Sequence, residues 1–99
     1  MKTDSTGLKY SSHKAPIYTF CLQFKEAIEQ LALRSLEGHN KYIKQDYDWK
    51  NFERVKNPDY EYGNATFRHA LGIGEDNELE HCTATAWNAI ARLQRKIKG

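Results

Sequence analysis

The sequence is poor in the features that mark secreted, membrane or zinc-binding proteins. Its 99 residues include only two cysteines, Cys21 and Cys82, so neither a disulfide framework nor a zinc-type cysteine spacing is available. Both fall inside helical patterns, and we predict that they are buried thiols. No stretch approaches the roughly 20 apolar residues of a membrane span, and the N-terminus lacks the apolar core of a secretory signal. We therefore expect a cytoplasmic protein with no membrane partner.

A dense basic face is also missing. The 15 Lys and Arg residues against 13 Asp and Glu leave a formal net charge of only +2, so no nucleic-acid partner is expected. A glycine-rich phosphate loop is absent as well, because Gly72-Ile73-Gly74 is too short and follows no predicted strand. A chain of this length forms one domain and buries only part of its apolar surface, so a homo-oligomer is expected.

What the sequence does contain is helical periodicity. Residues 1–13 are polar and without a period, and we expect a flexible arm there, before a single domain over residues 14–99. From Ile17 to about Lys44, apolar residues recur every 3.6 positions on two neighbouring rows. This first helix is apolar around much of its circumference, so it should lie at the centre of a bundle or be shared with a second subunit.

Two further helices are predicted. Asn57 offers a capping side chain and Pro58 a proline at the first helical position, which starts a second helix over about 58–72. A third helix begins after Asp76 or Asn77 and runs to the C-terminus. Its apolar stripe is predicted to face the core and consists of Leu79, Cys82, Ala86, Ile90, Leu93 and Ile97. The fold class is therefore all-α, a small bundle of three main helices completed by oligomerisation.

Two groups of acidic residues are candidates for holding a divalent cation. Glu26 and Glu29 lie one helical turn apart, and Glu29 is the better placed for a partly enclosed position. Such pairs are also common on solvated helix faces. A second group opens the third helix ahead of His81, where acids either complement the helix dipole or serve a metal-phosphate site. Its members are Glu75, Asp76, Glu78 and Glu80.

Basic and aromatic residues are candidates for contacts with phosphate and base. Lys41, Arg68 and His69 supply positive charge for phosphate, although each of them taken singly is more typical of an ordinary surface residue. Trp49 lies in a segment without a clean period, residues 45–57, and either stacks on a base or packs in the core. A polar stripe on the third helix is either a wet face or a hydrogen-bonding groove, and it consists of His81, Thr85, Asn88 and Arg92.

In order along the chain, these residues form a pattern. It runs through His13-Lys14-Ala15-Pro16, Lys25-Glu26-Ala27-Ile28-Glu29, Glu37-Gly38-His39-Asn40-Lys41-Tyr42, Trp49, Phe67-Arg68-His69, Gly74-Glu75-Asp76 and His81 to Ala86-Trp87-Asn88-Ala89. The pattern resembles the N-terminal domain of the dATP/dGTP diphosphohydrolase family, which is common in phage genomes. That family is grouped with the all-α MazG-like nucleoside triphosphate pyrophosphohydrolases. The resemblance covers nearly the whole chain after the N-terminal arm.

The resemblance implies cleavage of a purine nucleoside triphosphate between its α and β phosphates, dependent on Mg²⁺ or on Mn²⁺ in its place. It also implies a site between helices or subunits. On this basis the metal ligands are expected to be Glu29, Glu75, Asp76 and Glu78, and the catalytic residues Glu29, Glu75 and His81. The residues expected to bind the substrate are Lys41, Trp49, Arg68, His69 and Asn88.

Two other functions remain compatible with the same residues. A bundle that holds a nucleotide without cleaving it would serve as a sponge for nucleotide signals, in the host cytoplasm if the chain is phage-encoded. A structural or interaction domain would use the apolar surface of the first helix only as an oligomer interface. Pyrophosphate release and thermal stabilisation by nucleotides distinguish the three functions.

Overall fold

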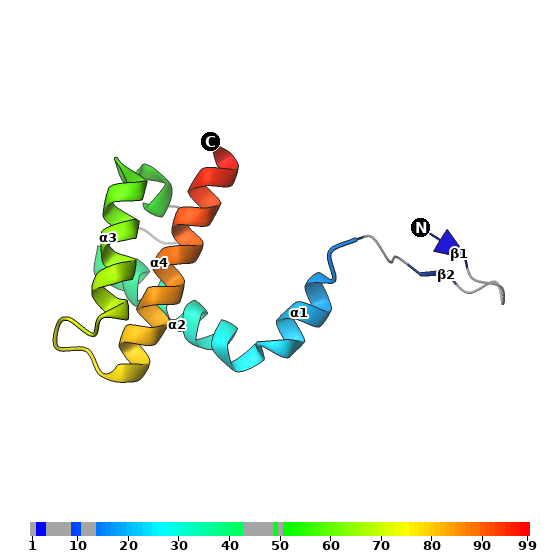
Figure 1. Cartoon of the computed structure of the whole chain (residues 1–99), viewed down its shortest axis with the longest axis horizontal. Coiled ribbons are helices and arrows are strands. Elements are labelled where there is room, and N and C mark those ends of the chain that lie inside the picture. The colour runs from blue at the N-terminus through cyan, green and yellow to red at the C-terminus, as the bar shows by residue number, and fades with distance from the viewer. Residues whose placement is uncertain (1, 4–8, 11–13, 43–48, 50) are drawn as a thin grey trace.

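A computed structural model of the chain describes residues 2–3, 9–10, 14–42, 49 and 51–99 (Figure 1). It confirms the all-α fold class. The helices are α1 (Ile17–Gln23), α2 (Lys25–Tyr42), the short 3₁₀ helix η1 (Asn51–Arg54), α3 (Pro58–Ala70) and α4 (Glu78–Lys98). In the N-terminal arm, where no strand was expected, β1 (Lys2–Thr3) pairs antiparallel with β2 (Lys9–Tyr10). The rest of the predicted arm lies outside the described residues.

The prediction of one continuous first helix was wrong, because the helix is interrupted at Phe24. The backbone of Phe24 turns away at φ −120° and ψ 34°, yet its N–H still donates to the carbonyl of Phe20, 3.2 Å away. The Phe24 carbonyl then accepts from Ile28 at 2.8 Å, so α2 starts at the break. No proline or glycine marks this position in the sequence. The predicted end near Lys44 lies outside the described residues.

The starts of the other two helices are confirmed. Asn77 caps α4, and its side-chain oxygen accepts from the N–H of Glu80 at 2.8 Å. Pro58 occupies the first turn of α3, as expected. Asn57 precedes it in the left-handed conformation, at φ 54° and ψ 58°, and its side chain makes no capping hydrogen bond. The predicted cap by the Asn57 side chain was therefore wrong, because the residue serves as a backbone turn instead.

The helix at the centre of the fold is α4, not the first predicted helix. Figure 1 shows α3 and α4 side by side and joined by a loop at one end, while α1 extends away from them. The side of α4 that faces inward carries small or polar residues, and α3 adds one buried aromatic. The buried residues are Tyr62, His81, Ala84, Asn88 and Ala91.

The apolar stripe predicted to face the core instead faces outward. Along α4, Leu79 is 61 % exposed, Ile90 52 % and Ile97 70 %. Cys82 on the same stripe is exposed, and so is Cys21 on α1, a helix that buries no residue. Both cysteines were predicted to be buried, and that prediction was wrong because each lies on an outward-facing helix surface. Much of the apolar surface of this chain is therefore uncovered by the chain itself.

Polar contacts fasten the remaining elements to α4. Arg95 donates to the carbonyls of Phe52 and Val55 at 2.9 and 2.8 Å, and the hydroxyl of Tyr62 donates to the Phe52 carbonyl at 2.9 Å. These bonds hold η1 and the residue after it against the α3–α4 pair. Phe52 is accordingly part-buried. Across the described ranges, no helix combines the length and apolarity needed to cross a bilayer.

Candidate functional site

A pocket of about 400 Å³ opens where α2 meets the α3–α4 pair. Its volume lies within the range of small-molecule sites, about 300–1,000 Å³. All five residues predicted to bind substrate contribute to its lining, although they come from three helices and the segment at Trp49. The full lining consists of Arg34, Ser35, Glu37, Gly38, His39, Lys41, Trp49, Phe52, Val55, Tyr62, Ala65, Arg68, His69, Trp87 and Asn88.

The charge of the pocket is mostly positive. Among the described lining residues, Arg34 and Lys41 come from α2 and Arg68 from α3, against one carboxylate, Glu37. The Nη1 of Arg34 lies 4.0 Å from Oε2 of Glu37, the long limit of an ion pair. Arg68 forms no ion pair with a described residue, so its guanidinium is available to an anion. The pocket therefore favours a ligand that carries more than one negative charge.

An aromatic pair stands in the pocket lining. The rings of His39 and Trp49 stack with centroids 4.1 Å apart and an interplanar angle of 16°. Trp49 remains 49 % exposed, while Nδ1 of His39 is buried and has no hydrogen-bond partner among the described residues. Trp49 thus keeps part of its surface accessible to a planar group of a ligand. His39 was missed at the sequence level, because only the fold brings it against Trp49.

Hydrogen bonds on α4 fix the floor of the pocket. Asn88 is buried, and its side-chain amide donates to the Ala84 carbonyl at 2.8 Å. The indole N–H of Trp87 reaches across to the Ser35 hydroxyl on α2 at 2.8 Å. Trp87 also meets the ring of Tyr62 edge-on, with centroids 6.2 Å apart. These contacts tie α2 to the α3–α4 pair and give the pocket a rigid base.

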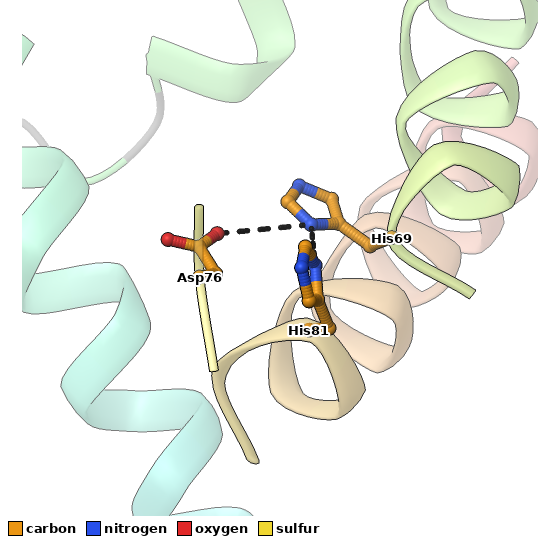
Figure 2. Close-up of side chains that lie close together, drawn as sticks. All are labelled: His69, Asp76 and His81. Carbon is orange, nitrogen blue, oxygen red and sulfur yellow. Dashed lines mark hydrogen bonds and ion pairs between the residues drawn. The ribbon is translucent and has the colours of Figure 1, made fainter. Parts of the chain in front are cut away.

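At the edge of the pocket, two histidines and an aspartate converge (Figure 2). Nδ1 of His69, from α3, lies 3.0 Å from Nδ1 of His81, from α4. The same His69 nitrogen lies 3.8 Å from Oδ2 of Asp76, in the connecting loop. The three ligand atoms all lie within 4.8 Å of one another, and no other such group of His, Cys, Asp or Glu occurs in the described part of the chain.

The environment of His69 favours its neutral form. Burial lowers the pKa of His69, and the charges of Arg68 and Arg34 and the neighbouring His81 lower it further, while Asp76 opposes them. The sum is a pKa below the usual histidine value. A neutral imidazole keeps one ring nitrogen with a lone pair, which a protonated one lacks. His69 is thus able to accept a hydrogen bond or to ligate a cation.

The loop between α3 and α4 positions Asp76 and packs on His81. Gly72 and Gly74 adopt positive φ values of 72° and 116°, which glycine tolerates and other residues resist. A Cβ placed on Gly74 would lie 3.8 Å from Cε1 of His81, so the loop backbone passes directly beside that ring. The loop that these two glycines allow therefore shapes the His69–Asp76–His81 group.

The structure does not bring all the predicted residues together. Lys41, Trp49, Arg68, His69 and Asn88 line one pocket, and Asp76 and His81 adjoin it through His69. Three predicted acids are exposed and belong neither to the pocket lining nor to the convergent group, namely Glu29, Glu75 and Glu78. Sequence analysis missed His39, Arg34 and Trp87. Of these, His39 and Trp87 stand within the quoted family motifs, which was the available signal.

The family comparison agrees with the resemblance seen in the sequence. Residues 4–99 match the family model described as dATP/dGTP diphosphohydrolase, N-terminal. The chain belongs to this family. No curated protein and no solved structure gives a significant match. The family name indicates a diphosphohydrolase, and the matching model describes the N-terminal part of such proteins.

The donor set of the convergent group differs from that expected for magnesium. Mg²⁺ prefers oxygen ligands and is usually held by one or two carboxylates together with substrate phosphates. His69, Asp76 and His81 offer two imidazoles and one carboxylate, which suit transition metals better. These residues therefore do not fit Mg²⁺ as a resident ion of the protein.

Proposed function

We propose that this domain binds a purine deoxynucleoside triphosphate in the pocket and hydrolyses it to the monophosphate and pyrophosphate. The observation that carries the proposal is the pocket of about 400 Å³ itself, which gathers three cationic side chains and an exposed indole. Family membership supports the same substrate class. A polyphosphate needs several cations and a base needs a flat apolar surface, and the pocket offers both.

The roles of the side chains follow from their positions. Arg68 and Arg34 approach from α3 and α2 and would bind phosphate oxygens, with Lys41 beside them. The exposed part of Trp49 would stack on the base. Asn88, fixed by its bond to Ala84, would present its amide oxygen from the floor. The nucleotide would thus lie across the pocket, with its phosphates at the three cationic side chains and its base at the indole of Trp49.

Magnesium enters this proposal as part of the substrate. Nucleoside triphosphates bind Mg²⁺ through their own phosphates, and the ion needs few protein ligands in such a complex. Hydrolysis adds water to the α-phosphorus, and pyrophosphate leaves with the electrons of the broken P–O bond. Of the residues predicted to be catalytic, His81 lies nearest the pocket, through its contact with His69. The catalytic roles of Glu29 and Glu75 stay predictions.

The test is to incubate the purified chain with purine and pyrimidine deoxynucleoside triphosphates and Mg²⁺ and to measure pyrophosphate and thermal stability. We expect pyrophosphate from the purine nucleotides. Arg68→Gln should weaken nucleotide binding by at least about tenfold, since a hydrogen bond to a charged group contributes about 1.5–3 kcal/mol. Lys98→Gln removes one cation outside the pocket and should leave binding unchanged. Equal losses in both variants would refute the pocket as the binding site.

A second candidate is a binding protein that does not hydrolyse its nucleotide. The exposure of Glu29, Glu75 and Glu78, away from the pocket lining, favours this alternative, because the described lining residues include no cluster of carboxylates to activate water. Thermal stabilisation by a nucleotide without any release of pyrophosphate would establish it. If nucleotides neither stabilise the protein nor are hydrolysed by it, the structural or interaction domain is the function that remains.

We also propose that the chain forms a homo-oligomer. The outward stripe of α4 and the fully exposed α1 supply the apolar surface, with Phe20 54 % and Leu93 59 % exposed. An amphipathic helix normally buries its apolar side, and α4 turns its small and polar side to its own chain. A second copy of this chain offers the matching apolar surface. Light scattering after gel filtration gives the subunit number directly.

A further inference from the structure

The group formed by His69, Asp76 and His81 stands apart from the magnesium chemistry discussed above. It lies where α3, the loop and α4 meet, and the side chains point toward a common centre (Figure 2). His81 is 7 % exposed and its ring is fixed between α3 and the loop. Because all three residues come from adjoining elements of the α3–α4 pair, their arrangement depends on the most tightly packed part of the fold.

We propose that His69, Asp76 and His81 bind a divalent first-row transition metal ion, such as Mn²⁺, Co²⁺ or Zn²⁺, in preference to Mg²⁺. Two imidazole nitrogens and a carboxylate oxygen form a donor set that these ions accept and that Mg²⁺ does not favour. Binding needs no nucleotide. The inference therefore stands whether or not the domain hydrolyses one.

The spacing of the two imidazole nitrogens matches a shared metal ion. Metal–nitrogen bonds of about 2.1 Å place two nitrogens that are 3.0 Å apart at about 90° around the ion. This is the angle between neighbouring ligands of an octahedron, and a widening of the nitrogen–nitrogen distance by about 0.4 Å gives the tetrahedral angle that Zn²⁺ prefers. Asp76 lies 3.8 Å from the His69 nitrogen, and its side chain is 36 % exposed, so it has room to close on the ion.

The ring nitrogens of His81 also point to Nδ1 as the ligand atom. Nε2 of His81 is buried and has no hydrogen-bond partner among the described residues. Within the part of the chain that the structure describes, the polar contact of the ring is the Nδ1 contact with His69. Without an ion, a hydrogen bond between the two Nδ1 atoms holds both rings in this orientation. A metal ion would take the place of the proton that the two Nδ1 atoms share, because both nitrogens already face one point.

Three protein ligands leave positions on an octahedral ion for water or for other oxygen ligands. His69 is also part of the pocket lining, so those positions adjoin the space assigned to the triphosphate. The ion is thereby placed to meet a phosphate oxygen at the pocket edge.

The direct test is a titration of the full chain, freed of metal with a chelator, with Zn²⁺ and separately with Mg²⁺. Nitrogen NMR of the imidazole groups reports which ring nitrogen binds. We expect the Nδ1 signals of His69 and His81 to shift and to saturate at one equivalent of Zn²⁺, while His39 does not respond. Mg²⁺ in large excess should leave all three unchanged. Shifts at His39 instead, or an equal response to Mg²⁺, would overturn the proposal.

Variants identify the carboxylate. Asp76→Asn should lower the affinity for Zn²⁺ at least about tenfold, whereas Glu75→Gln, its matched neighbour, should not change it. His69→Gln and His81→Gln should each have the same effect as Asp76→Asn. The amide spectrum of each variant shows whether that variant is folded. If a variant does not fold, the titration of the wild-type histidine signals with Zn²⁺ still tests the site. An equal loss in Glu75→Gln would assign binding to the acidic cluster and refute the site.

Discussion

At the scale of single residues, Trp49 is an aromatic side chain of the pocket that is both packed against a neighbour and open to a ligand. One face of its ring is stacked on His39, and the side chain is 49 % exposed. Trp49→Ala should therefore weaken binding of a purine deoxynucleotide by about tenfold, because stacking of a base on an aromatic side chain contributes about 1–3 kcal/mol. Nucleotide titration followed by calorimetry measures the loss.

The matched control for Trp49 is Tyr60→Ala, which removes an exposed aromatic ring outside the pocket. It should leave nucleotide affinity unchanged. A folded Trp49→Ala variant with wild-type affinity would show that the indole does not contact the base. Its unfolding would instead assign Trp49 to the core, the other role that the sequence allowed.

Residue types in a sequence predict chemistry better than they predict neighbours. The family motifs contained Lys41, Arg68 and Asn88, which the fold places around one pocket, whereas Arg34 in the same lining lies outside those motifs. The contact of His69 with Asp76 and His81 was not predictable from spacing, because it depends on how the loop at Gly74 folds back. The stack of His39 on Trp49 likewise joins separate segments.

At the scale of elements, Asp59 links α3 to the last turns of α4. Its carboxylate accepts from Arg92 and from Lys96, each at 2.9 Å. These two hydrogen bonds hold the pKa of Asp59 below its usual value, and the bond from Arg92 has the larger effect. A depressed carboxyl pKa means that the stabilisation is present above the unfolded pKa and is lost as the pH falls through the folded one.

Asp59→Asn should therefore lower the melting temperature slightly at neutral pH, and the difference from wild type should vanish in acid. The effect is small because Asp59 is exposed, and high salt should reduce it further. Thermal melts of both proteins over a pH series provide the measurement. A difference that persists at acidic pH would mean that the ion pair is not its cause.

The loop between α3 and α4 depends on backbone freedom at Gly74. Its φ of 116° is unfavourable for any residue with a Cβ, at a cost of about 1–3 kcal/mol. The nearest side-chain atom, on His81, lies at an ordinary contact distance of 3.8 Å, so Gly74→Ala should destabilise through strain rather than through a clash. Gly63→Ala, in a helix with open space around it, is the control. Equal stability of the Gly74→Ala variant and wild type in urea would contradict this.

Local signals explain which helix boundaries were predictable. Pro58 and Asn77 act within one turn of their own helices, so the starts of α3 and α4 followed from the sequence. The break at Phe24 has no such signal, since the surrounding residues all suit a helix. The ring of Phe24 stays near that of Phe20, with centroids 5.1 Å apart, which keeps the two parts of the predicted helix in contact.

At the scale of the whole molecule, the orientation of α4 was the largest error of the sequence prediction. Periodicity correctly found an apolar stripe, but it does not say whether that stripe is covered by the same chain or by another. Here the inward side holds Ala84, Asn88 and Ala91, and small residues allow α3 and α4 to approach closely. The apolar side stays uncovered by the described part of the chain.

This orientation leads to a prediction about assembly. Replacing Ile90 and Leu93 together by serine should convert the proposed oligomer to a monomer, because both side chains are more than half exposed and touch little of their own chain. Leu71→Ser, at the end of α3 and 74 % exposed, is the control and should leave the assembly intact. Light scattering over a range of protein concentrations measures the mass. If wild type and double variant are both monomeric, the apolar stripe has no second copy as its partner. If the double variant instead unfolds, the stripe is core, and the exposed side of α4 is part of how the chain holds itself together.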